Sequence, residues 1–432
     1  MKESFFVRGL AGEKKLEGRI SVGGAKNAIL KVLAATTLFD DRVTLQDVPD
    51  IEDVHRMCEL LENLGASVAK QENRTYAISA GGNITTTFDR HISSRLRASI
   101  VLVGPILARC GKVEFPHPGG CVIGARPIDY FLEGFEKLGA TVEHKDEHYH
   151  IEAKGGRLRG ADIFFPTPSH TVTETMMMAA TLAEGRTTLK NCAMEPEIAD
   201  LASFLNLCGA KIRGAGTSTI VIEGGKPLRA KGQVYRPIPD RIETGSFLIL
   251  GALSARELVI ENCNPVHIEI LIELLRKSGV AIETEADKII LHNNTKPNSA
   301  FRSLNIKTHE YPGFATDLQA PMVVYLTQVM GEGVVFETIF EGRLHYTNDV
   351  VRMGADITTW DAHRVQVKGP TPLIGRALGS PDLRAGLAFI IAASVAKGNS
   401  LIDNVYYIDR GYERIEERLS GIGLDITRRQ EK

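Results

Sequence analysis

One pattern recurs six times along the chain of 432 residues, and this recurrence constrains the fold more than any single motif. Each copy has a short β-rich segment, a polar loop, and an amphipathic segment that ends in Gly before a second strand. Subtracting the positions of successive glycines gives separations of 74, 70, 70, 75 and 69 residues, for Gly65, Gly139, Gly209, Gly279, Gly354 and Gly423. Such regular self-similarity indicates one structural unit copied along the chain.

The copies contain predicted helices of two kinds. The amphipathic kind mixes charges with apolar residues at helical spacing, at 53–64, 127–138, 197–207, 266–277 and 412–419. The other kind is apolar on nearly every face, at 29–38, 98–109, 175–183, 244–255, 318–330 and 383–396. A helix that is apolar all round has to be buried. We therefore expect compact α/β units, grouped as two lobes of three, with helices inside each lobe and sheets outside.

Composition excludes several classes of partner. Lys and Arg number 51 against 53 Asp and Glu, with no basic block, which disfavours nucleic acid. The six cysteines form no CxxC pair, so reduced, cytosolic thiols are the simplest interpretation. The N-terminal segment lacks the apolar core of a signal peptide, and the apolar runs are shorter than the roughly 20 residues that span a bilayer. We expect a soluble intracellular protein without a membrane partner.

Polar residues collect where the apolar helices begin. Thr, Asp and Asn at these positions are explained in part by capping of the first turn. The cations Lys26, Arg97 and Arg384 are not, because a positive side chain opposes the helix dipole at this end. Cations beside exposed amide groups are typical of a site for an anion.

The second copy is longer than the others. The distance from the end of its first strand to its glycine is 24 residues (Phe115 to Gly139), against 18 to 21 in the other copies. The excess lies in residues 116–127, where a Gly-rich loop carries Cys121 and is followed by Arg126, as in a mobile lid. Cys121 is either a small packing residue or a reactive thiol whose pKa is lowered by Arg126 and His117.

Six motifs carry a resemblance to a known family. They are Gly-Gly-Ala-Lys-Asn-Ala at 23–28, Pro-Gly-Gly-Cys-Val-Ile-Gly-Ala-Arg-Pro at 118–127, Pro-Asp-Arg-Ile-Glu-Thr-Gly at 239–245, Thr-Asp-Leu-Gln-Ala at 316–320, Asp-Leu-Arg-Ala at 382–385 and Ile-Asp-Arg-Gly-Tyr-Glu-Arg-Ile-Glu at 408–416. In this order and from end to end, the chain resembles the UDP-N-acetylglucosamine enolpyruvyl transferases. The resemblance implies transfer of the enolpyruvyl group of phosphoenolpyruvate to the 3-hydroxyl of UDP-N-acetylglucosamine, with release of phosphate. This reaction is the first committed step of peptidoglycan synthesis.

The resemblance also implies an architecture. The family fold is a two-lobed inside-out α/β barrel built from six repeated βαβαββ-type units, three per lobe, with helices inside and sheets outside. One lobe would comprise residues 1–25 plus 239–432, and the other residues 26–238, which carry the Cys121 loop. The lobes close over the substrates in a cytoplasmic enzyme that uses neither a metal nor an organic cofactor.

The resemblance assigns roles to individual residues. Lys26, Arg126 and Arg410 resemble the cations that hold phosphoenolpyruvate, and guanidinium forks suit both its phosphate and its carboxylate. Asp317 resembles the base that accepts the sugar hydroxyl proton. Cys121 resembles the lid thiol that acts as general acid or in product release, and that fosfomycin alkylates. The implied substrate-binding residues are Asn27, Arg97, Arg126, Pro127, Ser169, His170, Thr316, Ile339, Glu341, Arg343, Asp382 and Arg384.

The same residues also have simpler, structural interpretations. Each Arg suits a surface or lobe-linking ion pair, and Thr316-Asp317 suits a helix N-cap, which is compatible with a role as base. The family also shows Lys, one residue and Ser-Val-Gly-Ala-Thr where this chain has residues 167–173. Ser169 and Thr173 are retained, but the cation and the Gly are lost from a segment that resembles the part holding uracil and diphosphate. His170 is then either a replacement phosphate ligand or a solvent-facing side chain.

Three alternatives to the main function follow. The altered segment suits a paralogue that acts on another nucleotide sugar. A transferase for shikimate 3-phosphate would lack the cysteine loop and carry a Gly-Asn-Ala-Gly-Thr segment, which is absent from this sequence. A scaffold that binds a nucleotide sugar without turnover would have a broken set of charged residues, whereas this set is intact.

Overall fold

The computed structural model describes residues 3–430 apart from 83, 120–126 and 293. Cys121 and Arg126, two of the predicted site residues, therefore lie outside the described residues. The described chain divides into two compact units, one with residues 3–23 and 239–430 and the other with residues 24–119 and 127–238. Ala25 belongs to the second unit, where its amide donates to the Ile238 carbonyl at 2.7 Å.

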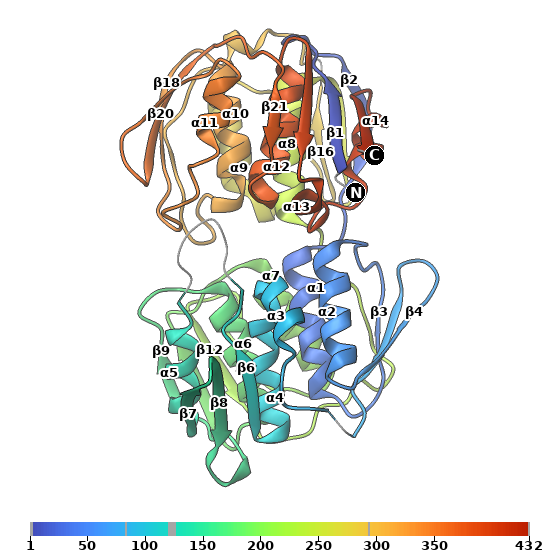
Figure 1. Cartoon of the computed structure of the whole chain (residues 1–432), viewed down its shortest axis with the longest axis vertical. Helices are drawn as coiled ribbons and strands as arrows, with labels where there is room; N and C mark the ends of the chain where they lie inside the picture. The colour runs from blue at the N-terminus through green and yellow to red at the C-terminus, as the bar shows by residue number, and fades with distance from the viewer. Residues whose placement is uncertain (1–2, 83, 120–126, 293, 431–432) are drawn as a thin grey trace. The chain divides into compact units, whose positions relative to one another are not determined.

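The first unit contains three four-stranded sheets. The first joins both ends of the chain, because β1 (Glu3–Arg8) pairs antiparallel with β23 (Asp425–Gln430) and with β22 (Asn399–Asp403), which β21 (Ala377–Gly379) extends (Figure 1). The second is β15 (Glu283–Thr284), β16 (Lys288–Leu291), β14 (Ala255–Glu261) and β2 (Leu16–Ser21). The third is β17 (Ile306–Lys307), β18 (Gly331–Phe336), β20 (Arg364–Gly369) and β19 (Asp356–Thr359).

The second unit also contains three sheets among its described residues. Two are four-stranded: β13 (Val234–Tyr235), β3 (Val43–Leu45), β5 (Tyr76–Ser79), β4 (Ser67–Lys70); and β11 (Ile212–Arg213), β12 (Thr219–Glu223), β10 (Arg186–Lys190), β9 (Asp162–Phe164). The third is three-stranded, with β6 (Lys112–Pro116), β8 (His148–Ala153) and β7 (Ala140–Lys145).

One pairing scheme recurs in these sheets. Each four-stranded sheet has one parallel edge pair, and its other pairs are antiparallel. In the three-stranded sheet a single parallel bridge, Thr87 with Glu114 of β6, takes the place of the edge strand. The recurring sequence pattern thus corresponds to a recurring local topology.

Apolar helices form the centre of each unit's core. In the first unit these are α8 (Arg241–Ser254), α10 (Gln319–Gln328) with the preceding 3₁₀ turn η6 (Thr316–Leu318), and α12 (Leu383–Val395), which pack against one another. Every residue of α8 and α10 is buried, as an all-round apolar sequence requires. In the second unit they are α1 (Lys26–Ala35) with η1 (Thr36–Leu38), η2 (Arg97–Leu102) with α4 (Val103–Cys110), and α6 (His170–Leu182).

The remaining helices bury only one side. They are α2 (Glu52–Asn63), α3 (Arg90–Arg95), α5 (Asp129–Lys137), α7 (Pro196–Leu207), η4 (Pro265–Ile268) with α9 (Glu269–Ser278), α11 (Thr347–Arg352), α13 (Val405–Asp409) and α14 (Ile415–Ser420), besides the short turns η3 (Lys154–Gly156) and η5 (Asn298–Ala300). The predicted helix at 412–419 begins only at Ile415, because Arg414 has a left-handed φ of 40°. Helix α11 was not predicted, since its six residues show little periodicity.

The six recurring glycines end these outer helices, as predicted. All six have φ between +87° and +113°, a region that L side chains disfavour, and each lies within three residues of a helix end. After α2, for example, the Ala66 amide returns to the Leu61 carbonyl at 2.9 Å, which satisfies a carbonyl at the helix end. Within the described residues, no helix has the length and apolar character needed to cross a membrane.

Candidate functional site

Asp317 receives two arginines from distant parts of the first unit. It lies in η6, at the start of the buried helix α10. Arg343 donates from Nη2 to Asp317 Oδ1 at 2.7 Å, and Arg384 donates from Nη2 to Oδ2 at 2.9 Å. The side chains of both arginines are at most 7% exposed, whereas that of Asp317 is 24% exposed. The two cations therefore contact the carboxylate from its buried side, and the carboxylate is partly exposed to solvent on the other side.

The two arginines decide the charge of Asp317. Burial alone would raise the pKa of this carboxyl, but Arg384, Arg343 and Arg241 outweigh it and hold the pKa well below the usual range. The group is thus an ionised carboxylate at neutral pH, with its proton-accepting oxygens committed to guanidinium groups. An anion that drew a guanidinium away would raise the pKa of Asp317 and make it a stronger base.

Thr316 does not act as an N-cap. The cap position of η6 is Ala315, and no side chain caps this turn. The Thr316 hydroxyl instead donates to Glu337 Oε2 at 2.8 Å and accepts from Arg343 Nη1 at 2.9 Å. Glu337 was not among the predicted site residues, although an acidic residue directly after the strand β18 is a usable signal.

Asp382 and Arg384 share the first turn of α12. Asp382 is the N-cap, because its Oδ1 accepts from the amides of Arg384 at 2.8 Å and Ala385 at 3.1 Å. Arg384 also donates from Nη1 to the Tyr412 hydroxyl at 3.0 Å, and its guanidinium lies 5.7 Å from the centre of that ring. Tyr412 belongs to a quoted motif, yet its contact with Arg384 was not predicted.

The other predicted residues of the first unit lie around this network with different degrees of burial. The Ile339 amide donates to Glu337 Oε1 at 2.8 Å. Glu341 is exposed in the following turn, and Arg410 is the half-buried C-cap of α13. The structure therefore brings together Thr316, Asp317, Ile339, Arg343 and Arg384 through direct bonds or through Glu337.

In the second unit, Lys26 forms a buried ion pair. Its Nζ lies 2.6 Å from Asp53 Oδ2, and both side chains are at most 10% exposed. Lys26 is thus a member of a buried ion pair, which is compatible with ligand binding. The first turn of α1 has no side-chain cap. Asn27 follows in the same turn and is partly exposed.

A second buried cluster lies at the start of α6. Lys31 Nζ is 3.1 Å from Glu174 Oε2, 3.3 Å from His170 Nδ1 and 2.8 Å from the Asn27 carbonyl. Burial raises the pKa of Glu174 to about 8, against the effect of Lys31 and with the help of Glu197 and Glu195. His170 is only 20% exposed, so its interpretation as solvent-facing is wrong. Ser169, the N-cap of α6, accepts from the Val172 amide at 3.4 Å.

The described flank of the Cys121 loop is tightly packed. Arg97 donates from Nη1 to the Pro118 carbonyl at 3.0 Å. A Cβ on Gly119 would lie 1.9 Å from the Ser94 carbonyl oxygen, so this glycine allows a close backbone approach. The pKa of His117 is lowered by burial and then by Arg97, which weakens its predicted role as a cation near Cys121. Pro127, on the other side of residues 120–126, is exposed.

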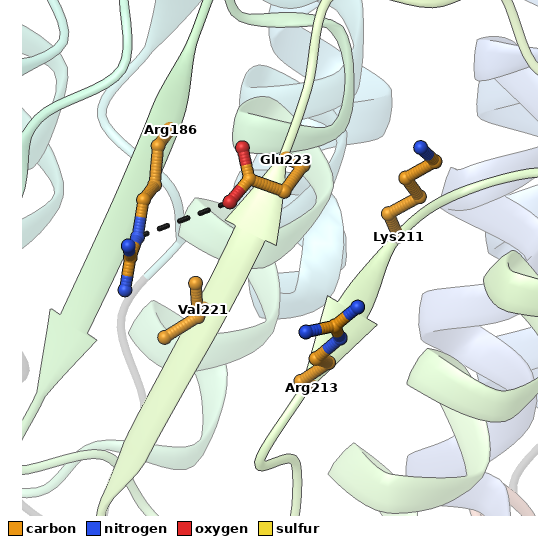
Figure 2. A pocket seen from close by; sticks show the side chains of 5 residues that line it. All are labelled: Arg186, Lys211, Arg213, Val221 and Glu223. Atoms are coloured by element: carbon orange, nitrogen blue, oxygen red, sulfur yellow. Dashed lines mark ion pairs between the residues drawn. The ribbon is translucent and has the colours of Figure 1, made fainter.

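A further hollow lies on the sheet formed by β9, β10, β11 and β12. Figure 2 shows Arg186 pointing toward Glu223, with an Nε to Oε1 distance of 3.9 Å, while Lys211 and Arg213 project from the neighbouring strand region. Val221 completes the lining. The hollow contains none of the predicted site residues, and exposed charges of this kind contribute little binding energy.

Comparison with known proteins shows which family the chain belongs to. The family model for EPSP synthase (3-phosphoshikimate 1-carboxyvinyltransferase) matches residues 10–419. The chain belongs to this family of carboxyvinyl, or enolpyruvyl, transferases. Individual relatives are more specific than the family model. The chain is 42% identical to a protein of Koribacter versatilis named UDP-N-acetylglucosamine 1-carboxyvinyltransferase, and the match covers 99% of this chain and 96% of that protein. It is also 43% identical to UDP-N-acetylglucosamine 1-carboxyvinyltransferase 2 of Carboxydothermus hydrogenoformans, over 97% of this chain and 98% of that one.

Solved structures agree on the fold. The enolpyruvyl transferase NikO from Streptomyces tendae superimposes with a TM-score of 0.86 at 22% identity, with both chains covered completely. An EPSP synthase from Acinetobacter baumannii superimposes with a TM-score of 0.72 at 18% identity, again over both whole chains. At these identities the likeness concerns the fold alone. The family membership expected from the six motifs is confirmed.

Proposed function

We propose that this chain transfers the enolpyruvyl group of phosphoenolpyruvate to the 3-hydroxyl of UDP-N-acetylglucosamine and releases phosphate, as the first committed step of peptidoglycan synthesis. The names of its full-length relatives support this reaction. The observation that carries the proposal is the Asp317 carboxylate held between Arg343 and Arg384 at the start of a buried helix. An ionised carboxylate beside displaceable guanidinium groups suits a base that works next to an anionic substrate.

The proposed chemistry is addition followed by elimination. The sugar 3-oxygen bonds to C2 of phosphoenolpyruvate and gives its proton to Asp317, while the methylene carbon takes a proton from the Cys121 thiol. The resulting tetrahedral ketal then loses phosphate, which takes up the proton held by Asp317, while a proton returns from the new methyl group to the Cys121 thiolate as the double bond reforms. Each proton taken up in the addition is thus matched by one released.

Cations would stabilise the negative charge that develops during the addition and elimination steps. We assign Lys26, Arg126 and Arg410 to the phosphate and carboxylate of phosphoenolpyruvate, with Arg97 and Arg384 as further donors. When substrate draws the Arg384 guanidinium from Asp317, the pKa of Asp317 rises toward a value suited to proton transfer. Binding of the anion would in this way activate the base.

The remaining predicted residues would hold the acceptor. Asn27 is assigned to the sugar, and Ser169 with His170 to the nucleotide, where His170 would replace the lysine of the family pattern. The contact of His170 Nδ1 with Lys31 supports a fixed ring orientation. Further contacts are proposed for Pro127, Thr316, Ile339, Glu341, Arg343 and Asp382.

The finer architecture belongs to the same proposal. Two lobes of three repeated units, each an inside-out barrel with buried helices and outer sheets, would account for the recurring pairing scheme and for the six glycine helix ends. A cytoplasmic location, a link to cell division and sensitivity to fosfomycin follow from the same family resemblance.

A second candidate is the same transfer to another nucleotide sugar. It is favoured by the buried cluster of Lys31, His170 and Glu174, because His170 belongs to the segment at 167–173 that departs from the family pattern. Transfer to shikimate 3-phosphate ranks below it, since the cysteine loop of this chain is expected to be absent from that enzyme.

Phosphate release separates these candidates. The purified protein is mixed with phosphoenolpyruvate and, in separate reactions, UDP-N-acetylglucosamine, other UDP-sugars and shikimate 3-phosphate. We expect the highest kcat/KM with UDP-N-acetylglucosamine. Preference for another UDP-sugar would select the second candidate, and no turnover with any UDP-sugar would refute both.

Fosfomycin tests the thiol independently. Burial raises the pKa of the five described cysteines, to about 11 or 12 for Cys58, Cys192, Cys208 and Cys263, so these thiols are poor nucleophiles. Rapid inactivation and a single alkylated peptide are expected for the parent, and neither for Cys121→Ser. Equal inactivation of both proteins, followed by mass spectrometry, would exclude Cys121 as the target.

A further inference from the structure

Glu337 is a buried carboxylate that the reaction described above does not use. It directly follows β18 and is 0% exposed. Its Oε1 accepts from Thr308 Oγ1 at 3.1 Å and from the amides of Ile339 at 2.8 Å and Phe340 at 3.2 Å. Its Oε2 accepts from Thr316 Oγ1 at 2.8 Å. These four donors are neutral, so the buried charge is balanced by hydrogen bonds with uncharged groups.

The carboxylate sets the direction of the Thr316 hydroxyl. A hydroxyl has one proton to donate and two lone pairs that accept. Because Thr316 gives its proton to Glu337, its oxygen presents lone pairs to Arg343, whose Nη1 donates at 2.9 Å. The other terminal nitrogen, Nη2, then meets Asp317 Oδ1 at 2.7 Å. The guanidinium is thus held by two neighbouring oxygens, one of which owes its orientation to Glu337.

The same carboxylate also holds the backbone that carries Arg343. The amides of Ile339 and Phe340 turn toward Glu337 Oε1 and fix the segment that leads from β18 to Arg343. Glu337 therefore joins the Arg343 segment to η6, which carries Thr316 and Asp317.

We propose that Glu337 is a positioning residue for catalysis, which orients the Thr316 hydroxyl and thereby directs Arg343 onto Asp317. The inference rests on the proposed function, in which Asp317 accepts the proton of the acceptor hydroxyl. It adds to that function a residue that contacts neither the reacting atoms nor Asp317. Its expected signature is a loss in kcat that depends on the Thr316 hydroxyl.

Glu337→Gln is the primary variant. The amide oxygen can keep the Ile339 and Phe340 contacts, but the NH₂ group then faces Thr316 and cannot accept its proton. We expect kcat to fall roughly ten- to a hundredfold, with a smaller change in the KM for phosphoenolpyruvate. Glu332→Gln is the matched control: it lies on β18, its side chain is 52% exposed and pairs with Lys368, and its kcat should equal that of the parent.

A double-mutant cycle separates positioning from general structural support. If Glu337 acts through Thr316, then Glu337→Gln lowers kcat much less in a Thr316→Val background than in the parent. Full additivity of the two substitutions in kcat would overturn the proposal. If Glu337→Gln fails to fold, Thr316→Ser and Thr316→Val decide instead, because only Ser keeps the hydroxyl. Serine should retain most of the parent kcat, and a serine variant as slow as the valine variant would overturn the proposal.

Failure of the proposed function is recognised separately. A parent that releases no phosphate with any acceptor refutes that function, and crystal structures of the parent and Glu337→Gln then test the positioning itself. Displacement of Arg343 Nη1 from Thr316 Oγ1 in the variant supports the inference. A guanidinium that stays on both Thr316 and Asp317 overturns it.

Discussion

Two buried ionic clusters lie at the starts of apolar helices, and the pKa values of their carboxyls are shifted in opposite directions. At η6 and α12, two arginines surround the single carboxylate of Asp317, and its pKa falls. At α6, burial raises the pKa of Glu174 to about 8; Glu197 and Glu195 add to this rise, and the single Lys31 opposes it. Because burial raises the pKa of both carboxyls, the number of cations beside each one decides whether it is a charged base or holds a proton.

The largest expected effect comes from removing the base. Asp317→Asn keeps the shape but cannot accept a proton, so kcat for phosphate release should fall roughly 10²- to 10⁴-fold. Asp361→Asn is a matched control, because that exposed carboxylate pairs only with neighbouring polar groups such as Arg364. A loss of less than threefold in Asp317→Asn would show that another group takes the proton.

Substitution in the Glu174 cluster should lower the free energy of unfolding more than it lowers kcat. Lys31→Met leaves a buried carboxyl without its cation, so the free energy of unfolding at pH 8 should drop by about 3 kcal/mol. At pH 5 Glu174 is protonated and the loss should be smaller. Urea denaturation measures both, with the exposed Lys211→Met as control. An equal loss at the two pH values would mean that Lys31 acts through packing alone.

The pH dependence of stability should also depend on Glu174. Its folded pKa of about 8 exceeds the ordinary 4.5, so its contribution is complete below pH 4.5 and is lost as the pH rises through 8. Relative to Glu174→Gln, the parent should therefore lose on the order of 3 kcal/mol between pH 5 and pH 8. The exposed Glu184→Gln should follow the parent curve. Parallel curves for parent and Glu174→Gln would contradict the raised pKa.

Asp317 should behave in the opposite way. Its lowered pKa stabilises the fold above the ordinary carboxyl range and loses this effect only in strong acid. Asp317→Asn should therefore leave the slope of stability between pH 5 and pH 8 unchanged. A change of slope in this window, measured by urea denaturation, would contradict the difference between the two clusters.

The smallest effect is expected at the edge of the Asp317 network. Tyr412→Phe removes the hydroxyl that accepts from Arg384 but keeps the ring beneath the guanidinium. We expect kcat to fall about three- to tenfold, as for the loss of one hydrogen bond to a charged group. Tyr406→Phe, on an exposed ring, is the control. An unchanged kcat would show that Asp317 alone orients Arg384.

Local features were predictable wherever they depend on neighbouring residues. The glycine helix ends and the apolar helices follow from periodicity and from the φ preference of Gly, and the structure contains them. Helix starts were predicted late for α8 and α6, because Asp240 and Ser169 cap one turn earlier than the apolar pattern begins. The six motifs correctly indicated the family, although the roles of their residues remain predictions.

Contacts between residues that lie far apart in the sequence were not predictable. Glu337, Lys31 and Glu174 lie in no motif that was assigned to the site, and their importance comes from residues 21 or 143 positions away in sequence, as for Glu337 with Thr316 and Lys31 with Glu174. The recurring pattern, the buried helices and the family could be read from the amino-acid order alone. Which charge meets which, and therefore which carboxyl is ionised, follows only from the folded structure, because hydrogen bonds and local potential depend on distances of a few ångströms that sequence spacing does not specify.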